Sequence, residues 1–102
     1  MTSLEYSFEE LKKILNPEQI EEIKNTAEEH LGIYHHGLGR YLRNHWELWT
    51  DGHLKKYFND LNIFHPDDMS GIIIHSFKRY LNKEEIHLEA QINYYKKYWA
   101  KK

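Results

Sequence analysis

Residues 66–81 read PDDMSGIIIHSFKRYL, and this stretch decides the fold. Proline suits the first position of a helix, and the two aspartates that follow it favour the positive end of the helix dipole. Apolar residues then recur at helical spacing, and the run Ile72-Ile73-Ile74 widens the apolar face. We therefore predict a helix over residues 66–81 that lies at the centre of the fold.

Two further helices are predicted before this one, each from a start signal. Ser7 and Glu10 have the spacing of a capping box, which predicts a first helix with Ser7 as its N-cap, ending near Leu15. The dipeptide Asn16-Pro17 then provides a good N-cap and a good first helical residue. Apolar residues at steps of three and four continue from there, which predicts a second helix over residues 17–31.

The rest of the chain is divided in the same way by turn residues and apolar stripes. In chain order we predict a connector at 33–37, a helix at 38–49, a turn at 50–52, a helix at 54–61, a connector at 62–65 and a last helix that begins at Glu84 or Glu85 and ends near Trp99. Strand signals are few, and no linker or internal repeat interrupts the pattern. The sequence therefore predicts an all-α class, with residues 1–102 forming a single compact domain of five to six short helices.

Composition narrows the class of protein and its compartment. With 102 residues, 40% hydrophobic and 29% charged, the chain has the make-up of one globular domain. It contains no cysteine, which favours a reducing, cytoplasmic location. No apolar run approaches the roughly 18 residues of a membrane span, and the first residues lack the pattern of a signal peptide. Eleven lysines against three arginines, with ten isoleucines, fit an AT-rich bacterial or phage genome.

The charge distribution gives a weak indication of partners. Residues 1–30 carry eight acidic and three basic side chains, a balance of -5, whereas residues 31–102 have a balance of +3. This polarity is far from the basic stripe of a nucleic-acid-binding protein, so nucleic acid is not the expected partner. One alternative is that the acidic helices imitate nucleic-acid charge toward a basic partner.

Two blocks of the sequence, together with its end, resemble a family of small uncharacterised bacterial helical proteins, known only as a domain of unknown function. The residues that carry the resemblance are Gly37-Leu38-Gly39-Arg40, Arg43-Asn44, Trp46, Leu48-Trp49, His65-Pro66-Asp67-Asp68-Met69-Ser70 and the ending from Gln91-Ile92 to Tyr98-Trp99. The resemblance spans roughly residues 34–100 and leaves the acidic residues 1–31 outside. It implies a helical domain and brings no activity, cofactor or site residue.

A first candidate site is an anion site over residues 37–43. Glycine allows close approach of the backbone, and the start of a helix offers free N–H groups to a phosphate. Arg40 and Arg43 are one turn apart, so both could bind one anion. The residues of this candidate site are His35, His36, Gly37, Gly39, Arg40 and Arg43. The alternative is a glycine-rich helix entry with solvated arginines, because a dinucleotide fingerprint would require a preceding strand.

A second candidate is catalytic and pairs Arg40 with His45. Some metal-independent ribonucleases place an arginine and a histidine on one helix. Five positions on a helix, however, turn two side chains about 140° apart. This spacing also arises by chance in a chain with eight histidines.

The sequence gives little support to a metal site or to an acid–base site made of paired carboxylates. No two histidines have the H-x-x-x-H spacing of a zinc helix, and there is no cysteine, so we expect no metal and no cofactor. Asp67 and Asp68, like Glu84 and Glu85, stand where helices are predicted to begin. We interpret them as partners of the helix dipole rather than as acid–base groups.

A third candidate is a contact patch of aromatic residues for a protein partner. Tyr94 and Tyr98 lie four apart on a face of the last helix beside Lys97, and Tyr34 precedes the glycine-rich segment. Rings of this kind anchor protein partners. The aromatic residues expected in the core instead are Trp46, Trp49, Tyr95 and Trp99.

Together these patterns favour binding over catalysis. The expected function is a non-catalytic binding protein, an inhibitor or adaptor of a larger protein. A nucleotide- or phosphate-binding domain using residues 37–43 is the first alternative, and a ribonuclease using Arg40 and His45 is the second. The oligomeric state stays open.

Overall fold

The computed structural model describes residues 2–46 and 52–101, and this part of the chain contains six α-helices and no strand. The predicted all-α class is therefore confirmed. The elements are α1 (Ser3–Ile14), α2 (Pro17–Asn25), the 3-10 helix η1 (Glu28–Tyr34), the π-helical turn η2 (His35–Gly39), α3 (Arg40–His45), α4 (His53–Asp60), α5 (Pro66–Leu81) and α6 (Leu88–Ala100). The radius of gyration, 12.9 Å, is that expected of one domain of this length.

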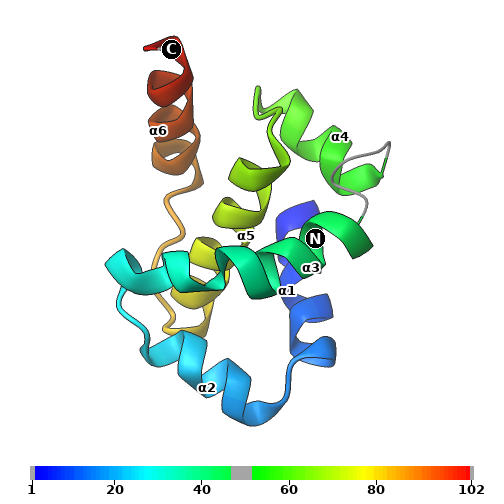
Figure 1. The fold of residues 1–102 in the computed structure, drawn as a ribbon, viewed down its shortest axis with the longest axis vertical. Coiled ribbons are helices and arrows are strands. Elements are labelled where there is room, and N and C mark those ends of the chain that lie inside the picture. The colour runs from blue at the N-terminus through cyan, green and yellow to red at the C-terminus, as the bar shows by residue number, and fades with distance from the viewer. Residues whose placement is uncertain (1, 47–51, 102) are drawn as a thin grey trace.

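Helix α5 lies at the centre and touches every other helix, as the sequence predicts (Figure 1). Met69, Ile72, Ile73 and Phe77 are fully buried, and they join residues from α1, α2, α3 and α4 in one core. The apolar residues of α5 point in several directions, so no single neighbour could cover them. Helix α6 stands along one side of the molecule, and its C-terminal end projects beyond the body (Figure 1).

The first helix begins earlier than its sequence signal suggested. Thr2 is the N-cap, because its hydroxyl accepts from the Glu5 amide at 3.1 Å while the Glu5 carboxylate accepts from the Thr2 amide at 3.2 Å. Ser7 lies inside the helix, and its hydroxyl donates to the Leu4 carbonyl at 2.5 Å. The prediction of Ser7 as N-cap is therefore wrong, since Thr2 and Glu5 have the same spacing one and a half turns earlier.

The second helix begins as predicted and ends six residues early. Asn16 caps it in a capping box with Gln19, and Pro17 is its first residue. It ends at Asn25 because Thr26 turns to extended backbone and its hydroxyl donates to the Glu22 carbonyl at 2.7 Å. Residues 28–34 then form the tighter 3-10 helix η1.

Residues 33–37, predicted as a connector, are helical. The 3-10 helix η1 passes directly into the π-helical turn η2 and then into α3, so the chain is helical without a break from residue 28 to residue 45. Trp46 is the C-cap of α3. Trp49 and most of the turn predicted at 50–52 lie outside the described residues.

The last helix begins at Leu88 rather than at Glu84 or Glu85, and the cause lies in how α5 ends. Lys83 has a left-handed backbone with φ of 58°, and the Glu84 amide donates to the Arg79 carbonyl at 2.9 Å. The Arg79 side chain then holds the Ile86 carbonyl at 2.6 Å. These bonds keep residues 84–87 out of a helix, and His87, which has a left-handed backbone, then caps α6.

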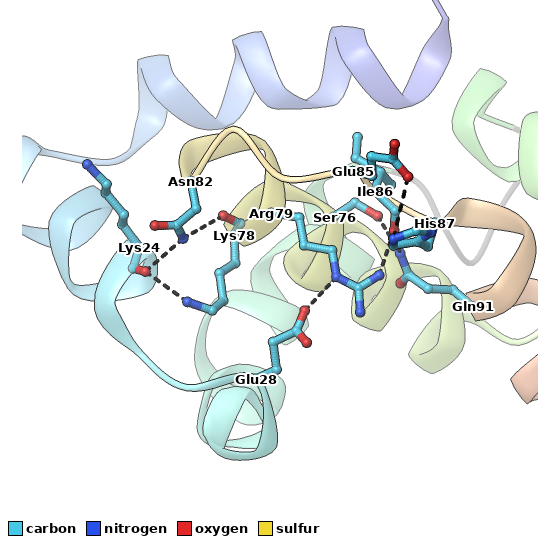
Figure 2. Close-up of polar contacts among 10 residues, drawn as sticks. All are labelled: Lys24, Glu28, Ser76, Lys78, Arg79, Asn82, Glu85, Ile86, His87 and Gln91. Carbon is cyan, nitrogen blue, oxygen red and sulfur yellow. Dashed lines mark hydrogen bonds and ion pairs between the residues drawn. The ribbon is translucent and has the colours of Figure 1, made fainter.

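Polar side chains from the second half of α5 reach the main chain on both sides of it (Figure 2). Lys78 and Asn82 donate to the Lys24 carbonyl at 2.8 and 2.9 Å, which satisfies the exposed end of α2. Arg79 donates to the Glu28 carboxylate at 2.5 Å and, on the other side, to the Ile86 carbonyl at 2.6 Å. The same helix therefore fixes the end of α2, the start of η1 and the segment before α6.

Among the described residues, no helix combines the length and the apolar character that crossing a membrane requires.

Candidate functional site

A cleft lies between the first turn of α5 and the second half of α6. Its volume is about 370 Å³, within the range of small-ligand sites. We call it the α5–α6 cleft, and it is lined by His65, Asp67, Asp68, Tyr94, Tyr95, Tyr98 and Trp99. The lining therefore combines carboxylates from one helix with aromatic rings from the other.

Trp99 joins the two sides of this cleft. Its indole N–H donates to Oδ2 of Asp68 at 2.7 Å, and its ring stacks on His65 with 3.7 Å between centroids. Because His65 is the N-cap of α5 and Asp68 lies in its first turn, both contacts hold the end of α6 against one point. Trp99 nevertheless keeps 41% of its surface exposed.

A glycine brings α5 and α6 close together beside the cleft, in the neighbouring cavity that Tyr95 also lines. A Cβ atom at Gly71 would lie 2.8 Å from the Tyr95 hydroxyl oxygen. Only a residue without a side chain leaves room for this hydroxyl. Gly71 therefore sets how deeply Tyr95 enters between the helices.

Burial shifts the pKa values of two groups in the cleft. Burial raises the pKa of Asp68 above its ordinary value of 3.8, and the hydrogen bond from Trp99 offsets part of the effect. Burial also raises the pKa of Tyr95 to about 12, with a further contribution from the charge of Asp68. The Tyr95 hydroxyl is therefore protonated at neutral pH and can act as a hydrogen-bond donor.

Two more cavities adjoin the cleft and share its residues. One, of about 250 Å³, reaches Leu31, His35 and His75 and is lined by Asp67, Asp68 and Tyr95 as well. The other, of about 480 Å³, continues along α6 past Tyr94 and Tyr95 toward the Arg79 side chain. Tyr95 lines all three, so the seam between α5 and α6 is hollowed along much of its length.

The structure separates the two arginines of the predicted anion site. Arg43 is buried, at 6% exposure, and donates to the Ser70 hydroxyl at 2.9 Å and to the His35 carbonyl at 3.0 Å. Its Nε lies 3.3 Å from Asp67. Arg40 is exposed. The guanidinium of Arg43 is thus engaged inside the fold, and Arg40 alone of the pair faces solvent.

The glycines of that segment have different surroundings. Gly39 is buried, and a Cβ there would lie 3.0 Å from Nη1 of Arg43 and 3.2 Å from the Tyr34 carbonyl. A Cβ at Gly37 would meet open space. Gly39 therefore makes room for Arg43 rather than for a ligand. His36 is exposed, and its ring packs edge-to-face on that of His35.

The proposed catalytic pair is not brought together around one point. Arg40 and His45 stand at opposite ends of α3, five positions apart, so their side chains diverge by about 140°. The His45 ring stacks on Tyr41 at 4.1 Å, and its Nδ1 contacts the Tyr41 carbonyl at 3.0 Å.

Tyr34, predicted as a partner contact, is half-buried at the end of η1, on a different element from Tyr94 and Tyr98. Its hydroxyl donates to Glu22 at 2.6 Å, which fastens the start of η2 to α2. The ring borders a separate cavity of about 420 Å³. The other residues of that cavity are Ile14, Leu15, Gln19, Glu22, Ile23, Gly37, Leu38 and Tyr41.

Across residues 2–46 and 52–101, no three histidine or carboxylate side chains are arranged to hold a metal ion.

The sequence predicts the outward placement of two residues of the cleft and misses the placement of others. Tyr94 and Tyr98 are exposed, at 64% and 44%. The prediction that Trp99 lies in the core is wrong, because Trp99 is exposed and its indole lines the cleft, where it donates to Asp68. Asp68 was interpreted only as a dipole partner. Asp68 stands four residues before Ile72 and so shares a helix face with the apolar core, but its pairing with Trp99 leaves no mark in the sequence.

The fold and the cleft define a small helical domain with an aromatic and acidic groove on one side. The chain belongs to the family described as Domain of unknown function (DUF6794), whose model matches residues 2–81. The predicted membership of a family of unknown function is confirmed, but the matched span includes the acidic first thirty residues and ends at the last residue of α5. No curated protein and no solved structure matches the chain.

Unfolding at mildly acidic pH is expected to depend on His75. Burial lowers the pKa of His75 below its ordinary value of 6.5, against an opposing effect of Glu28, while Arg79 lowers it further. The folded protein therefore binds this proton less tightly than the unfolded chain does. Its contribution to stability is complete above pH 6.5 and is lost as the pH falls toward the folded pKa, with a slope of at most about 1.4 kcal/mol per pH unit.

Urea denaturation at several pH values between 7.5 and 5 measures this effect. We expect His75→Gln to lose less stability over this range than the unsubstituted protein, and His36→Gln, at an exposed histidine, to change the slope little. Parallel curves for the unsubstituted protein and His75→Gln would contradict the assignment.

Proposed function

We propose that this protein is a non-catalytic binding protein, an inhibitor or adaptor that acts on a larger protein in the cytoplasm of a bacterial cell and is encoded by the bacterium or its phage. The observation that carries the proposal is the exposed aromatic face of α6. Tyr94, Tyr98 and Trp99 are 64%, 44% and 41% exposed. We call these three residues the α6 aromatic face.

The position of α6 supports a role in partner binding. Of the residues of α6, all of which are described, only Ile92 is buried. A helix that serves only the fold would turn its large rings inward, where they stabilise most. Tyrosine and tryptophan are instead the residues that carry most of the binding energy in protein interfaces. Their exposure on a projecting helix therefore suits a partner surface.

The two alternatives drawn from the sequence have less support. An anion site over residues 37–43 would have to bind through Arg40 alone, because the donors of Arg43 are engaged with Ser70 and His35. A ribonuclease would need Arg40 and His45 to converge, and α3 directs them apart. Lack of cysteine supports the cytoplasm, and the excess of lysine over arginine supports the bacterial or phage source.

Partner capture with paired variants tests the proposal. The tagged protein is compared with Tyr94→Ala/Tyr98→Ala and with a control, Tyr6→Ala/Tyr41→Ala, which removes two tyrosines of similar exposure from other faces. We expect a partner that binds the unsubstituted protein and the control alike. Its affinity, measured by calorimetry, should fall at least about tenfold in the α6 variant, because each exposed aromatic anchor contributes over about 1 kcal/mol.

Two results would count against the proposal. In the first, the control variant loses the partner and the α6 variant keeps it. In the second, no partner is captured, while nucleotides raise the melting temperature of the unsubstituted protein and leave Arg40→Ala unchanged.

A further inference from the structure

We infer that the α5–α6 cleft is a binding site for an organic cation, and that its occupant is a lysine or arginine side chain of the protein partner. This inference rests on the proposed function, because it names the chemistry by which the α6 aromatic face recognises a partner.

The rings of the cleft are arranged as walls at right angles. Tyr94 and Tyr95 meet edge-to-face, with 5.1 Å between centroids and 85° between planes. Tyr98 and Trp99 repeat the arrangement one turn later, at 5.1 Å and 87°. All four rings line the same cleft, and His65 stacks on Trp99, so the π surface open to a ligand comes mainly from the tyrosines. Such a surface attracts ammonium and guanidinium groups, most strongly when the cation is partly removed from water.

Two carboxylates stand at the α5 side of the same space. Asp68 is 8% exposed and is held by the Trp99 indole, whereas the Asp67 side chain is 59% exposed with Arg43 beside it. An arriving guanidinium can therefore approach Asp67 from solvent while it stacks on the rings. Among the described residues that line the cleft, none is a lysine or an arginine. The cleft thus offers negative charge and π faces together.

An anion fits the same cleft poorly. The N-terminal end of α5 would attract one, but Asp67 and Asp68 already occupy its first turn. The amides of Asp68 and Met69 donate to the His65 carbonyl at 3.0 and 3.1 Å, so they are engaged in the fold. Lys96 and Lys97 of α6 and its C-cap Lys101 do not line the cleft. A phosphate placed there would face two carboxylates, with no lysine or arginine among the lining residues to bind it.

The N–H signal of the Trp99 indole reports directly on the cleft, because this group donates to Asp68 inside it. In a nitrogen-15 correlation spectrum of the full chain, the signal is assigned by its loss in Trp99→Phe. The probes are Nα-acetyl-arginine amide, Nα-acetyl-lysine amide, the uncharged isostere Nα-acetyl-citrulline amide, putrescine and sodium phosphate, all at constant ionic strength. We expect a saturable shift with the arginine or lysine amide in the millimolar range, and a response to citrulline amide at least tenfold weaker.

Matched variants locate the binding. Asp68→Asn keeps an oxygen that can accept from Trp99 and removes the charge, and it should weaken the response to arginine amide at least fivefold. Glu89→Gln, which removes an exposed carboxylate of α6 outside the cleft, should leave the response unchanged. If Asp68→Asn does not fold, Tyr94→Ala/Tyr98→Ala gives the same test at exposed positions, with Tyr41→Ala as its control.

The outcomes separate this inference from the proposed function. A shift with putrescine alone would overturn the side-chain assignment in favour of a free amine, and a shift with phosphate alone would overturn the cation site. Equal shifts with arginine amide and citrulline amide would do the same. If the cation titration fails while partner binding still depends on Tyr94 and Tyr98, the binding function stands without the cation site. If the titration succeeds and partner binding ignores these residues, the proposed function fails instead.

Discussion

Replacing Arg43 with alanine is expected to lower the free energy of unfolding by about 3 kcal/mol, the lower end of the range for breaking a buried charged contact. The guanidinium is 6% exposed and bonds to Ser70 and His35, with Asp67 at 3.3 Å. Its removal leaves the His35 carbonyl without this donor and opens a cavity beneath η2. Urea denaturation followed by circular dichroism measures the change.

The matched control is Arg40→Ala, at the other arginine of the same helix. Arg40 is exposed, so its replacement should change the free energy of unfolding by less than about 0.5 kcal/mol. Equal stability of the two variants would contradict a structural role for Arg43. It would instead favour the predicted anion site, in which Arg43 binds a ligand rather than stabilising the fold.

Phe77→Ala should be more damaging still, with a loss of about 3–5 kcal/mol. Phe77 is completely buried on α5, and its ring packs 6.0 Å from that of Phe8 and 6.3 Å from that of Tyr80. A domain of this size has a total stability of about 5–15 kcal/mol, so the variant could lose most of it.

Phe64→Ala provides the control for this substitution. Phe64 is 60% exposed in the segment before α5, so the same change of side chain removes little buried surface. Its melting temperature should stay close to that of the unsubstituted protein, while that of Phe77→Ala falls by well over ten degrees. A similar fall in both variants would show that α5 does not form the centre of the core.

The sequence predicted helices best where a local signal begins them. Asn16, Pro17 and Pro66 mark the starts of α2 and α5 at the residues where the structure has them. These signals depend on neighbours within four residues, so they can be recognised in the chain itself. Thr2 was missed for a different reason, because Ser7 offers the same pattern a few residues later and cannot be told apart from it by spacing.

Helix ends were harder to predict because distant side chains set them. The Lys24 carbonyl near the end of α2 is satisfied by Lys78 and Asn82, more than fifty residues away. The Ile86 carbonyl is held by Arg79, which delays the start of α6. No periodicity records such contacts. The exposed and buried arginines of α3 are indistinguishable in the sequence for the same reason.

The candidate site also combines features that local sequence predicts with features that depend on distant contacts. Tyr94 and Tyr98 could be assigned to an outer face of the last helix from their spacing alone. The cleft itself could not be predicted, since it depends on how α6 lies against the first turn of α5. Only the folded chain shows that Asp68 and Trp99, 31 residues apart, are bonded to one another.

The central position of α5 also sets the order in which the domain can fold during synthesis. Its contacts join residues far apart in the chain, such as Lys12 with Tyr80 and Glu28 with Arg79. A nascent chain emerges from the ribosome with its N-terminus first, so the apolar sides of α1, α2 and α3 remain uncovered until residues 66–81 follow. Short amphipathic helices are marginal by themselves. The domain should therefore assemble late and in a single cooperative event. Until then, we expect chaperones to bind the exposed apolar surface of its first half.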